Sequence, residues 1–333
     1  MASVQEAIDD AAERIGFSGV VRIDDEDGST WAAAYGDADR GHAIANTTDT
    51  IFALASGGKG FTALTVASLI DDGTIGFDTT ARSLLGDDLP LISDDVTVEL
   101  LLAHRSGIGD YLDEEEWDVT EVVMPISVHR LAETEDFVAV LDGFPMAFAP
   151  DERFAYCNGG FVVLALLAER AAQTPFHELV RTRVCEPAGL ADTGFLRSDE
   201  LPGRAALGYL GDGPRTNIFH LPVLGSGDGG IYSTAADIRT MWTALFDGRI
   251  VRPETVATMV RPRSIVPEDE RRYGLGFWLH ETSDVVMLTG YDAGASFRSF
   301  HDPTRSRTRT VIANATDAAW DMSDAIDEVL GPI

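Results

Sequence analysis

Segments with strand character are confined to the two ends of this chain of 333 residues, and its middle has helical character. Residues 17–23 and 30–36 flank a turn-rich segment, which predicts a β-hairpin after an opening helix. Four short segments near the C-terminus are rich in β-branched and aromatic residues and predict strands before a closing helix at about 319–330. These strand segments are residues 274–279, 284–289, 295–300 and 308–314. We therefore expect an α/β (α+β) fold with a sheet domain of residues 1–79 and 222–333 and an inserted helical domain of residues 80–221.

The apolar pattern also predicts individual helices. Residues 61–70 are apolar nearly all round and precede Gly73, which is typical of a buried helix with a glycine stop. Thr234 is the expected N-cap of a helix that extends to about Trp242. Further helical segments are expected at residues 96–103, 137–141 and 160–172.

Lys59 is the only lysine among the 25 lysine and arginine residues, and it stands three positions after Ser56. Arginine stays protonated under nearly all conditions, whereas a desolvated lysine amine can lose its proton and act as a base. Ser56 is expected at or just before the first turn of the helix containing residues 61–70, so the two side chains face the same way. The pair is a candidate nucleophile and activator, although the same spacing also arises by chance.

The charge of the chain argues against some classes of partner. The 55 acidic and 25 basic residues give a formal net charge of −30. Such a field repels nucleic acids and anionic membranes, and the one short basic cluster, Arg305 to Arg309, is too small to form a binding stripe. Acidic runs such as residues 24–27 and 110–118 are typical of solvated loops. We expect neither a nucleic acid nor a membrane partner, and the oligomeric state is left open.

The sequence also predicts where the protein resides. Residues 1–14 carry acids where a secretory signal has a basic start and an apolar run. The longest apolar stretch, residues 161–168, is too short to span a bilayer. We expect a cytoplasmic protein with Cys157 and Cys185 reduced. Cysteines and histidines lack metal-site spacing, so neither a metal nor a cofactor is expected.

Three ordered motifs carry a family resemblance. They are Ser56 to Lys59, Tyr156 to Asn158, and Leu288 with Thr289 and Gly290. Flanking segments at residues 101–107, 186–194 and 229–237 also match. Over nearly its whole length the chain resembles the penicillin-recognising serine hydrolases, in the branch with class C β-lactamases, D-alanyl-D-alanine carboxypeptidases and related carboxylesterases. The resemblance implies a β-lactamase/transpeptidase-like fold, with an antiparallel sheet flanked by helices and an inserted helical region.

The resemblance also implies roles for individual residues. Ser56 would attack the substrate carbonyl, and either Lys59 or Tyr156 would take the first proton. Asn158 would hydrogen-bond Lys59 or the acyl side of the substrate. The backbone amides of Ser56 and Tyr291 would stabilise the developing oxyanion. Leu288, Thr289 and Gly290 would form the strand that binds the substrate.

Leu288 departs from the family pattern. Relatives that bind a substrate carboxylate carry a lysine, a histidine or another cation there, and an alkyl chain removes that charge-assisted hydrogen bond. Arg298, in the next strand segment, is an alternative source of charge. We therefore predict hydrolysis of small esters or amides with weak or no β-lactamase activity.

Several residues have structural interpretations as well. The glycine pair Gly57-Gly58 replaces an aliphatic and a hydroxyl residue of the family, which indicates close backbone approach or extra room beside the nucleophile. His104 is expected to be a packed, hydrogen-bonded residue rather than a base. Cys157 is expected to point away from the site.

The sequence predicts a serine acyl hydrolase that forms an acyl-enzyme intermediate and acts on a small-molecule ester or amide. The alternatives are a β-lactamase or D-alanyl-D-alanine carboxypeptidase or D-aminopeptidase, and a non-catalytic scaffold that retains the fold. Acyl transfer to an acceptor other than water would use the same residues.

Overall fold

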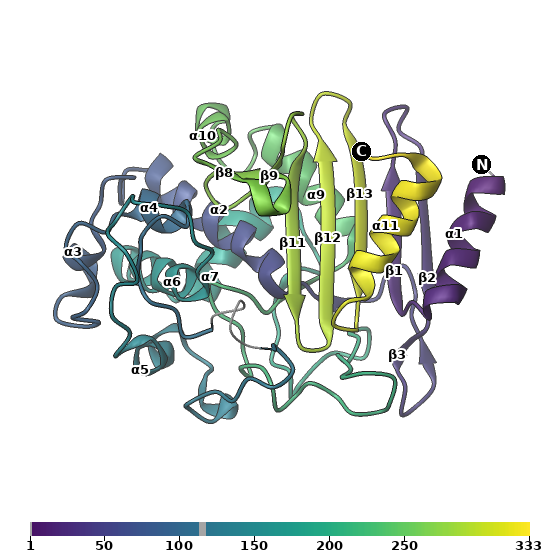
Figure 1. Cartoon of the computed structure of the whole chain (residues 1–333), viewed down its shortest axis with the longest axis horizontal. Helices are drawn as coiled ribbons and strands as arrows, with labels where there is room; N and C mark the ends of the chain where they lie inside the picture. The colour runs from purple at the N-terminus through teal and green to yellow at the C-terminus, as the bar shows by residue number, and fades with distance from the viewer. Residues whose placement is uncertain (1, 113–117) are drawn as a thin grey trace.

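An eight-stranded antiparallel sheet joins the two ends of the chain (Figure 1). The computed structural model describes residues 2–112 and 118–333. In spatial order the strands are β2 (Thr30–Tyr35), β1 (Gly19–Asp24), β13 (Arg307–Ala313), β12 (Ala295–Asp302), β11 (Val286–Asp292), β10 (Trp278–His280), β9 (Arg271–Tyr273) and β8 (Ser264–Val266). The N-terminal strand β1 pairs with the C-terminal strand β13, with Val21 opposite Val311. The predicted hairpin and the shared sheet are both present.

Helices cover both faces of this sheet. On one face α1 (Ala2–Ile15) packs against α11 (Ala318–Leu330), and both can be followed in Figure 1. The apolar cluster beneath them includes Ile8, Phe17 and Met322. On the opposite face α9 (Ala235–Phe246) contacts β1 and β13, and its Trp242 indole donates to Ser299 Oγ at 2.9 Å. Thr234 caps α9 as predicted, because its hydroxyl accepts the backbone N–H of Asp237.

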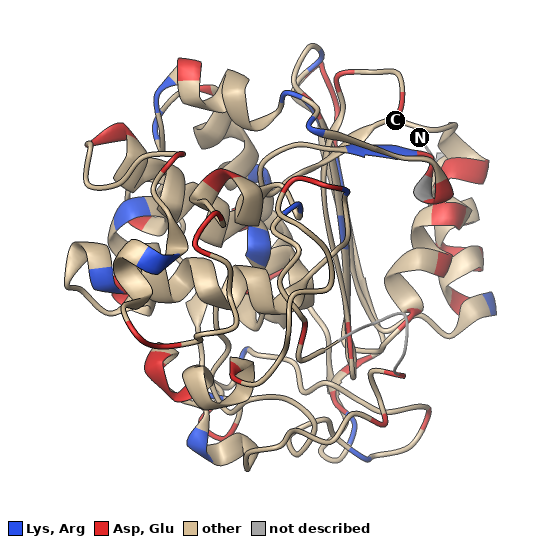
Figure 2. Cartoon of the chain, turned by 60° about the vertical axis from the view of Figure 1, so that its left-hand side comes forward, with Lys and Arg blue, Asp and Glu red and all other residues tan. Residues whose placement is uncertain are grey.

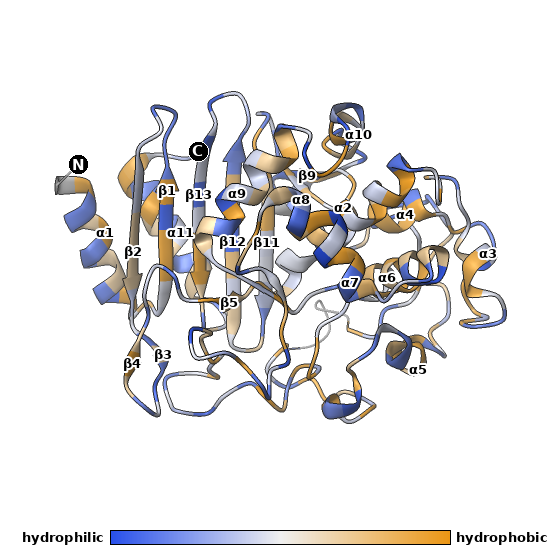
Figure 3. Ribbon diagram, turned by 180° about the vertical axis from the view of Figure 1, so that it is seen from behind, coloured by the Kyte–Doolittle hydropathy of each residue, from blue (hydrophilic) through white to orange (hydrophobic). Residues whose placement is uncertain are grey.

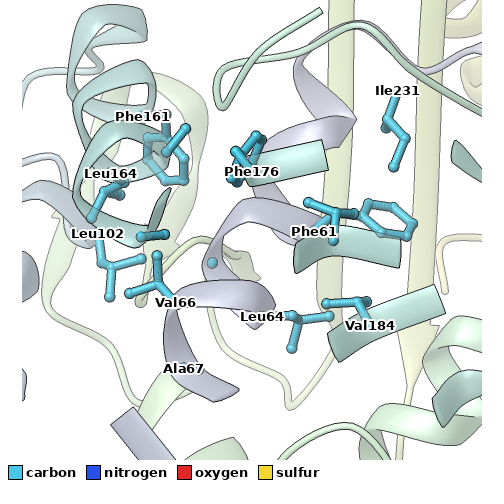
Figure 4. Packing of buried hydrophobic residues seen from close by; sticks show 14 of the residues in the cluster. Phe61, Leu64, Val66, Ala67, Leu102, Phe161, Leu164, Phe176, Val184 and Ile231 are labelled. Carbon is cyan, nitrogen blue, oxygen red and sulfur yellow. The ribbon is translucent and has the colours of Figure 1, made fainter. Parts of the chain in front are cut away.

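Two buried helices form the centre of the helical part of the molecule. Residues 58–69 of α2 (Gly58–Asp71) are all buried, and residues 158–168 of α6 (Asn158–Ala172) are buried as well. Phe61 and Leu64 of α2 and Phe161 of α6 belong to the same apolar core (Figure 4). In Figure 3 these two helices lie beside the sheet, beyond β11, and their ribbons are largely in the hydrophobic colours. The smaller helices are α3 (Ala81–Leu85), α4 (Val98–Leu102), α5 (Val138–Leu141), α7 (Phe176–Val180), α8 (Glu186–Ala188) and α10 (Pro253–Met259).

Short strands complete the fold. One small sheet has the order β5 (Phe52–Ala53), β7 (Ile231–Ser233), β6 (Gly194–Phe195), and the other pairs β3 (Asp37–Asp39) with β4 (Ile44–Ala45). Because β5 directly precedes the Ser56 turn, the first small sheet fixes the entry to α2. The main apolar core contains sheet residues such as Phe297 together with helix residues such as Phe161. The domain boundaries at residues 79 and 222 stay a prediction.

Two sequence predictions were wrong in detail. The strand expected at residues 274–279 is mostly a turn, in which Gly274 N–H bonds Phe277 O. Gly276 has φ +84°, and a Cβ there would lie 2.2 Å from Ala63 Cβ, so the chain turns closely against α2 before β10 begins. Asp24, expected in a solvated run, is 5% exposed and is paired with Arg22 at 2.8 Å. Figure 2 shows acidic residues, in red, on helices and loops around the molecule.

Candidate active site

The candidate nucleophile Ser56 lies in a tight turn, η1 (Ala55–Gly57), between β5 and α2. Ala55, the residue before it, has φ +47°, a left-handed conformation that costs a residue with a Cβ atom about 1–2 kcal/mol. At Gly57 a Cβ atom would lie 2.4 Å from Phe297 Cδ1. The nucleophile turn therefore packs so closely on β12 that position 57 requires glycine, in agreement with the predicted close approach.

Lys59 contacts Ser56 directly. Its Nζ donates to Ser56 Oγ at 2.8 Å, to Asn158 Oδ1 at 2.7 Å and to the backbone oxygen of Asp228 at 2.7 Å. The lysine is 2% exposed, in the first turn of a mostly apolar helix. Burial disfavours the charged form of an amine, and a neutral amine is the form in which a lysine acts as a base.

Tyr156 and Asn158 lie at the start of α6, next to Lys59. The Tyr156 ring centroid is 4.8 Å from Lys59 Nζ. The same ring packs on His104 at 4.4 Å and stacks on Trp278 at 6.1 Å with an interplanar angle of 12°. Asn158 is 2% exposed, and its Nδ2 donates to Leu112 O at 2.9 Å. The structure therefore brings Ser56, Lys59, Tyr156 and Asn158 together.

Asp110 holds the start of α6 in place. Its carboxylate accepts the backbone N–H groups of Asn158 at 2.5 Å and Gly159 at 2.8 Å. Burial raises the pKa of Asp110 to about 6, against the opposing effect of these backbone hydrogen bonds. Part of the acidic run 110–118 is thus a buried helix cap rather than a solvated loop. Residues 113–117 of that run lie outside the described residues.

Asp228 is a further residue that contacts Lys59. Its Oδ2 accepts a hydrogen bond of 2.5 Å from the Tyr111 hydroxyl, while its backbone oxygen binds Lys59. Burial raises the pKa of Asp228, and the nearby Lys59 opposes that shift. Burial and Asp228 together raise the pKa of Tyr111 well above its ordinary value, so this phenol keeps its proton.

The third motif lies on β11, beside the nucleophile turn. A Cβ atom at Gly290 would lie 2.0 Å from Leu54 O and 3.0 Å from Ser56 N, so only glycine permits this approach. The next residue in the strand is Tyr291, whose amide the resemblance pairs with that of Ser56 as oxyanion donors. Leu288 is 3% exposed and packs over Gly60 of α2, where a Cβ atom would lie 2.6 Å from Leu288 Cδ2.

Arg298 does not replace the cation that the third motif lacks. Its Nη1 donates to Asp324 Oδ1 of α11 at 3.0 Å, and its guanidinium lies over the rings of Phe300 and Trp320. The side chain therefore points to the α11 face of the sheet, and the sequence-based suggestion that it supplies charge to the site is wrong.

His104 has the structural role that the sequence predicts. It is 1% exposed, and its Nδ1 accepts the Cys157 backbone N–H at 3.1 Å. Burial and Lys59 hold its pKa well below the ordinary value, so the imidazole is neutral. Cys157 is buried, and its Sγ accepts the Gly160 N–H at 3.3 Å, so it caps α6 and points away from Ser56. Cys157 and Cys185 form no disulfide.

A cleft opens beside Ser56, and the space between its walls, open solvent included, is about 910 Å³. Of the residues expected from the sequence, Ser56, Asn158 and Tyr291 line it. Leu288, Thr289 and Gly290 are absent from its described lining, because β11 meets the cleft only at its Tyr291 end. The expected role of these three residues in substrate binding stays a prediction.

The comparison with known proteins identifies the family. The sequence model of the Beta-lactamase family matches residues 4–330. The chain belongs to the Beta-lactamase family of serine hydrolases. The resemblance and the fold predicted from the motifs are both confirmed by this match and by the solved structures.

Among curated relatives, penicillin-binding protein 4* of Bacillus subtilis (strain 168) is 27% identical over 267 residues, which cover 74% of this chain and 56% of that protein. Esterase EstB of Burkholderia gladioli is 27% identical over 278 residues, which cover 73% of this chain and 69% of the esterase. The chain thus spans little more than half the length of penicillin-binding protein 4*.

Solved structures of the family have the same fold. A penicillin-binding protein from Bacillus halodurans superposes with a TM-score of 0.91 at 32% identity, covering 97% of this chain and 100% of that one. A D-amino acid amidase from Ochrobactrum anthropi SV3, solved with L-phenylalanine, has a TM-score of 0.79 at 23% identity, covering 98% and 97%. The second similarity shows the fold alone.

Sequence reasoning missed Asp110 and Asp228 as residues of this family site. Asp110 follows Gly109, just after the 101–107 segment, and Asp228 lies in the glycine-rich run of residues 225–230. An acid that directly follows a glycine, close to a family segment, was the available signal in both places. No group of metal-ligating side chains occurs in residues 2–112 and 118–333. In that same part of the chain, every helix is too short or too polar to cross a bilayer.

Proposed function

We propose that this chain is a serine acyl hydrolase that cleaves a small ester or amide through an acyl-enzyme at Ser56. The observation that carries the proposal is the 2.8 Å contact between Lys59 Nζ and Ser56 Oγ in a site where Lys59 is 2% exposed. A buried amine in contact with a hydroxyl is a common form of activated nucleophile. The relatives named esterase and amidase agree with this reaction class.

The chemistry follows from the contacts. Ser56 Oγ bonds to the carbonyl carbon, and its proton passes to a neutral Lys59 or to an ionised Tyr156. The carbonyl oxygen becomes an oxyanion that the amides of Ser56 and Tyr291 would stabilise. When the bond to the leaving group breaks, the same base returns the proton to the departing oxygen or nitrogen. Water then attacks the acyl-enzyme by the same route and restores Ser56.

The environment of Leu288 supports substrates without a carboxylate at that strand. An alkyl side chain packed over Gly60 offers no hydrogen-bond donor, and Arg298 is committed to Asp324 on the other face of the sheet. Asp228 and Asp292 line the cleft, so a carboxylate on the substrate would also face repulsion. We therefore favour neutral or cationic acyl groups over penicillins and D-alanyl peptides.

Steady-state kinetics with p-nitrophenyl butyrate and nitrocefin test this function. We expect the ester to be hydrolysed at least about 100-fold more efficiently than nitrocefin in kcat/KM, which corresponds to about 2.7 kcal/mol of transition-state discrimination. Ser56→Ala should abolish the ester activity. Equal turnover of the two substrates would contradict the substrate class, and full ester activity in Ser56→Ala would contradict the site.

A further inference from the structure

The cleft beside Ser56 is acidic. Asp228 and Asp292 line it, and the described lining contains no lysine or arginine. His220 is the one histidine of that lining, and burial lowers its pKa, so it adds no positive charge at neutral pH. A net charge of −30 adds a field of the same sign around the molecule, which attracts cations.

Within residues 2–112 and 118–333, Asp228 has no cationic side chain at ion-pair distance, whereas the buried Asp24, Arg298 and Arg309 each form an ion pair. Its Oδ2 accepts from Tyr111, and Lys59 binds its backbone oxygen rather than its carboxylate. Taking a carboxylate out of water without a counter-ion is unfavourable, which is why burial raises its pKa. A cation bound in the cleft would supply that counter-ion.

Ser226 provides an independent sign of a polar ligand. It lines the same cleft and is 2% exposed, yet its Oγ has no hydrogen-bond partner in the described part of the chain. Ser198, also in the lining, has an equally buried Oγ without a partner among the described residues. Buried hydroxyls are nearly always hydrogen-bonded in folded proteins, so these two oxygens have hydrogen-bonding capacity that a polar group in the cleft can use.

We propose that this part of the cleft binds a protonated primary amine carried by the acyl group of the substrate, with Asp228 as its counter-ion and Ser226 as a second acceptor. An ammonium group has three donors, which suit a carboxylate oxygen and a hydroxyl together. Val119, Met124 and Leu221 of the same lining are apolar and accommodate a short hydrocarbon chain. This inference rests on the proposed acyl hydrolase function.

The contact between Lys59 and Asp228 couples substrate binding to activation of the nucleophile. Lys59 Nζ binds the backbone oxygen of Asp228, and the two side-chain charges interact. An ammonium group that neutralises Asp228 adds positive charge near Lys59 and thereby favours the neutral amine. The neutral amine is the form that accepts the proton of Ser56. Substrates with the ammonium group should therefore gain in kcat as well as in KM.

Matched pairs of p-nitroanilides test the subsite. β-Alanine p-nitroanilide carries an ammonium group where butyric acid p-nitroanilide carries a methyl group, and each enantiomer of alanine p-nitroanilide has isobutyric acid p-nitroanilide as its neutral match. We expect kcat/KM for an ammonium substrate to exceed that of its neutral match by about tenfold or more, or about 1.4 kcal/mol. In Asp228→Asn this ratio should fall to within about threefold of one, whatever the absolute rates.

Asp284→Asn is the matched control, because it removes the same charge from an exposed position outside the cleft. It should keep the wild-type ratio. A ratio that survives in Asp228→Asn, or that falls equally in Asp284→Asn, would overturn the proposal, as would a wild-type enzyme that prefers the neutral substrates.

A binding measurement separates this inference from the proposed function. In Ser56→Ala, calorimetric titration should show n-butylammonium binding more tightly than 1-butanol, and Asp228→Asn should remove the difference. If wild type hydrolyses p-nitrophenyl butyrate while both ligands bind equally, the amine subsite is wrong and the hydrolase function stands. If butylammonium binds through Asp228 and neither esters nor anilides are hydrolysed, the function is wrong and the subsite stands.

Discussion

The carboxylate of Asp110 accepts the backbone N–H of Asn158 at 2.5 Å, and the Asn158 side chain accepts from Lys59. Asn158 thus links the buried carboxyl group of Asp110 to the Lys59 amine, which contacts Ser56. The partial positive charge at a helix N-terminus stabilises the ionised carboxylate at this place. The position of Asn158 therefore depends on the protonation state of Asp110.

The pH dependence of stability tests this cap. The pKa of Asp110 is about 6 in the folded protein against an ordinary 3.8, so the folded state keeps this proton at pH values where the unfolded chain has released it. The contribution of Asp110 to the free energy of unfolding is therefore greatest below the unfolded pKa and falls as the pH rises to about 6. Denaturant unfolding measures the free energy of unfolding of wild type and of Asp110→Asn from about pH 3.5 to about pH 7. The difference between the two free energies should decline as the pH rises and then level off. A constant difference over this range would contradict the raised pKa.

Lys59→Arg keeps a positive charge while preventing its loss at neutral pH. If the neutral amine takes the proton of Ser56, kcat/KM for p-nitrophenyl butyrate should fall by about 100-fold to 10,000-fold. Thermal unfolding monitored by circular dichroism controls for misfolding. This control is needed because Lys59 is 2% exposed and a guanidinium group is larger than an amine. Activity within about threefold of wild type in a folded variant would exclude Lys59 as the base and leave that role to Tyr156.

His104 should position Tyr156 and Cys157 rather than act in proton transfer. Its φ of +53° suits asparagine better than alanine, and an asparagine Oδ1 can replace Nδ1 as acceptor for the Cys157 N–H. We expect His104→Ala to lose about 1–3 kcal/mol more stability than His104→Asn, because it leaves that buried N–H unpaired. Chemical denaturation measures the difference. The acid limb of the pH profile of kcat should be the same in both variants, and a limb that moves with the substitution would indicate a catalytic histidine.

Gly57→Ala should destabilise the nucleophile turn. The added Cβ would lie 2.4 Å from a ring carbon of Phe297, which is fully buried. Overpacking of this kind costs about 1–3 kcal/mol. Gly213→Ala is the control, since a Cβ there has nothing within 4 Å, and it should change the free energy of unfolding by less than about 0.5 kcal/mol. Equal stability of both variants would show that β12 yields to the extra methyl group.

Local sequence patterns predicted most of the fold. The apolar run of residues 61–70 and the glycine after it describe α2 almost to its ends, and the hairpin of β1 and β2 follows from alternation around a polar turn. The strands at the edge of the sheet were harder to predict from the sequence. β8 and β9 have three residues each. The need for glycine at position 276 comes from its close approach to Ala63, a residue distant in sequence. Short edge strands and tertiary turns of this kind leave little local signal.

The residues of the candidate site also fall into those that local spacing predicts and those that depend on distant contacts. Ser56 and Lys59 are three apart in one helical turn, so their spacing alone predicts the contact. Tyr156 and Asn158 were found through the family resemblance, since no local rule brings them to a lysine 99 positions from Asn158. Asp110 and Asp228 were missed because their roles depend on partners 48 and 169 positions away in the chain.

Intact-mass spectrometry after incubation with a fluorophosphonate tests the central claim, that Ser56 is a nucleophile activated in this site. The account predicts one covalent adduct per chain, carried by the peptide that contains Ser56, absent in Ser56→Ala and slowed in Lys59→Arg. A folded wild-type protein that gains no adduct, or an adduct that persists unchanged in Ser56→Ala, would contradict it.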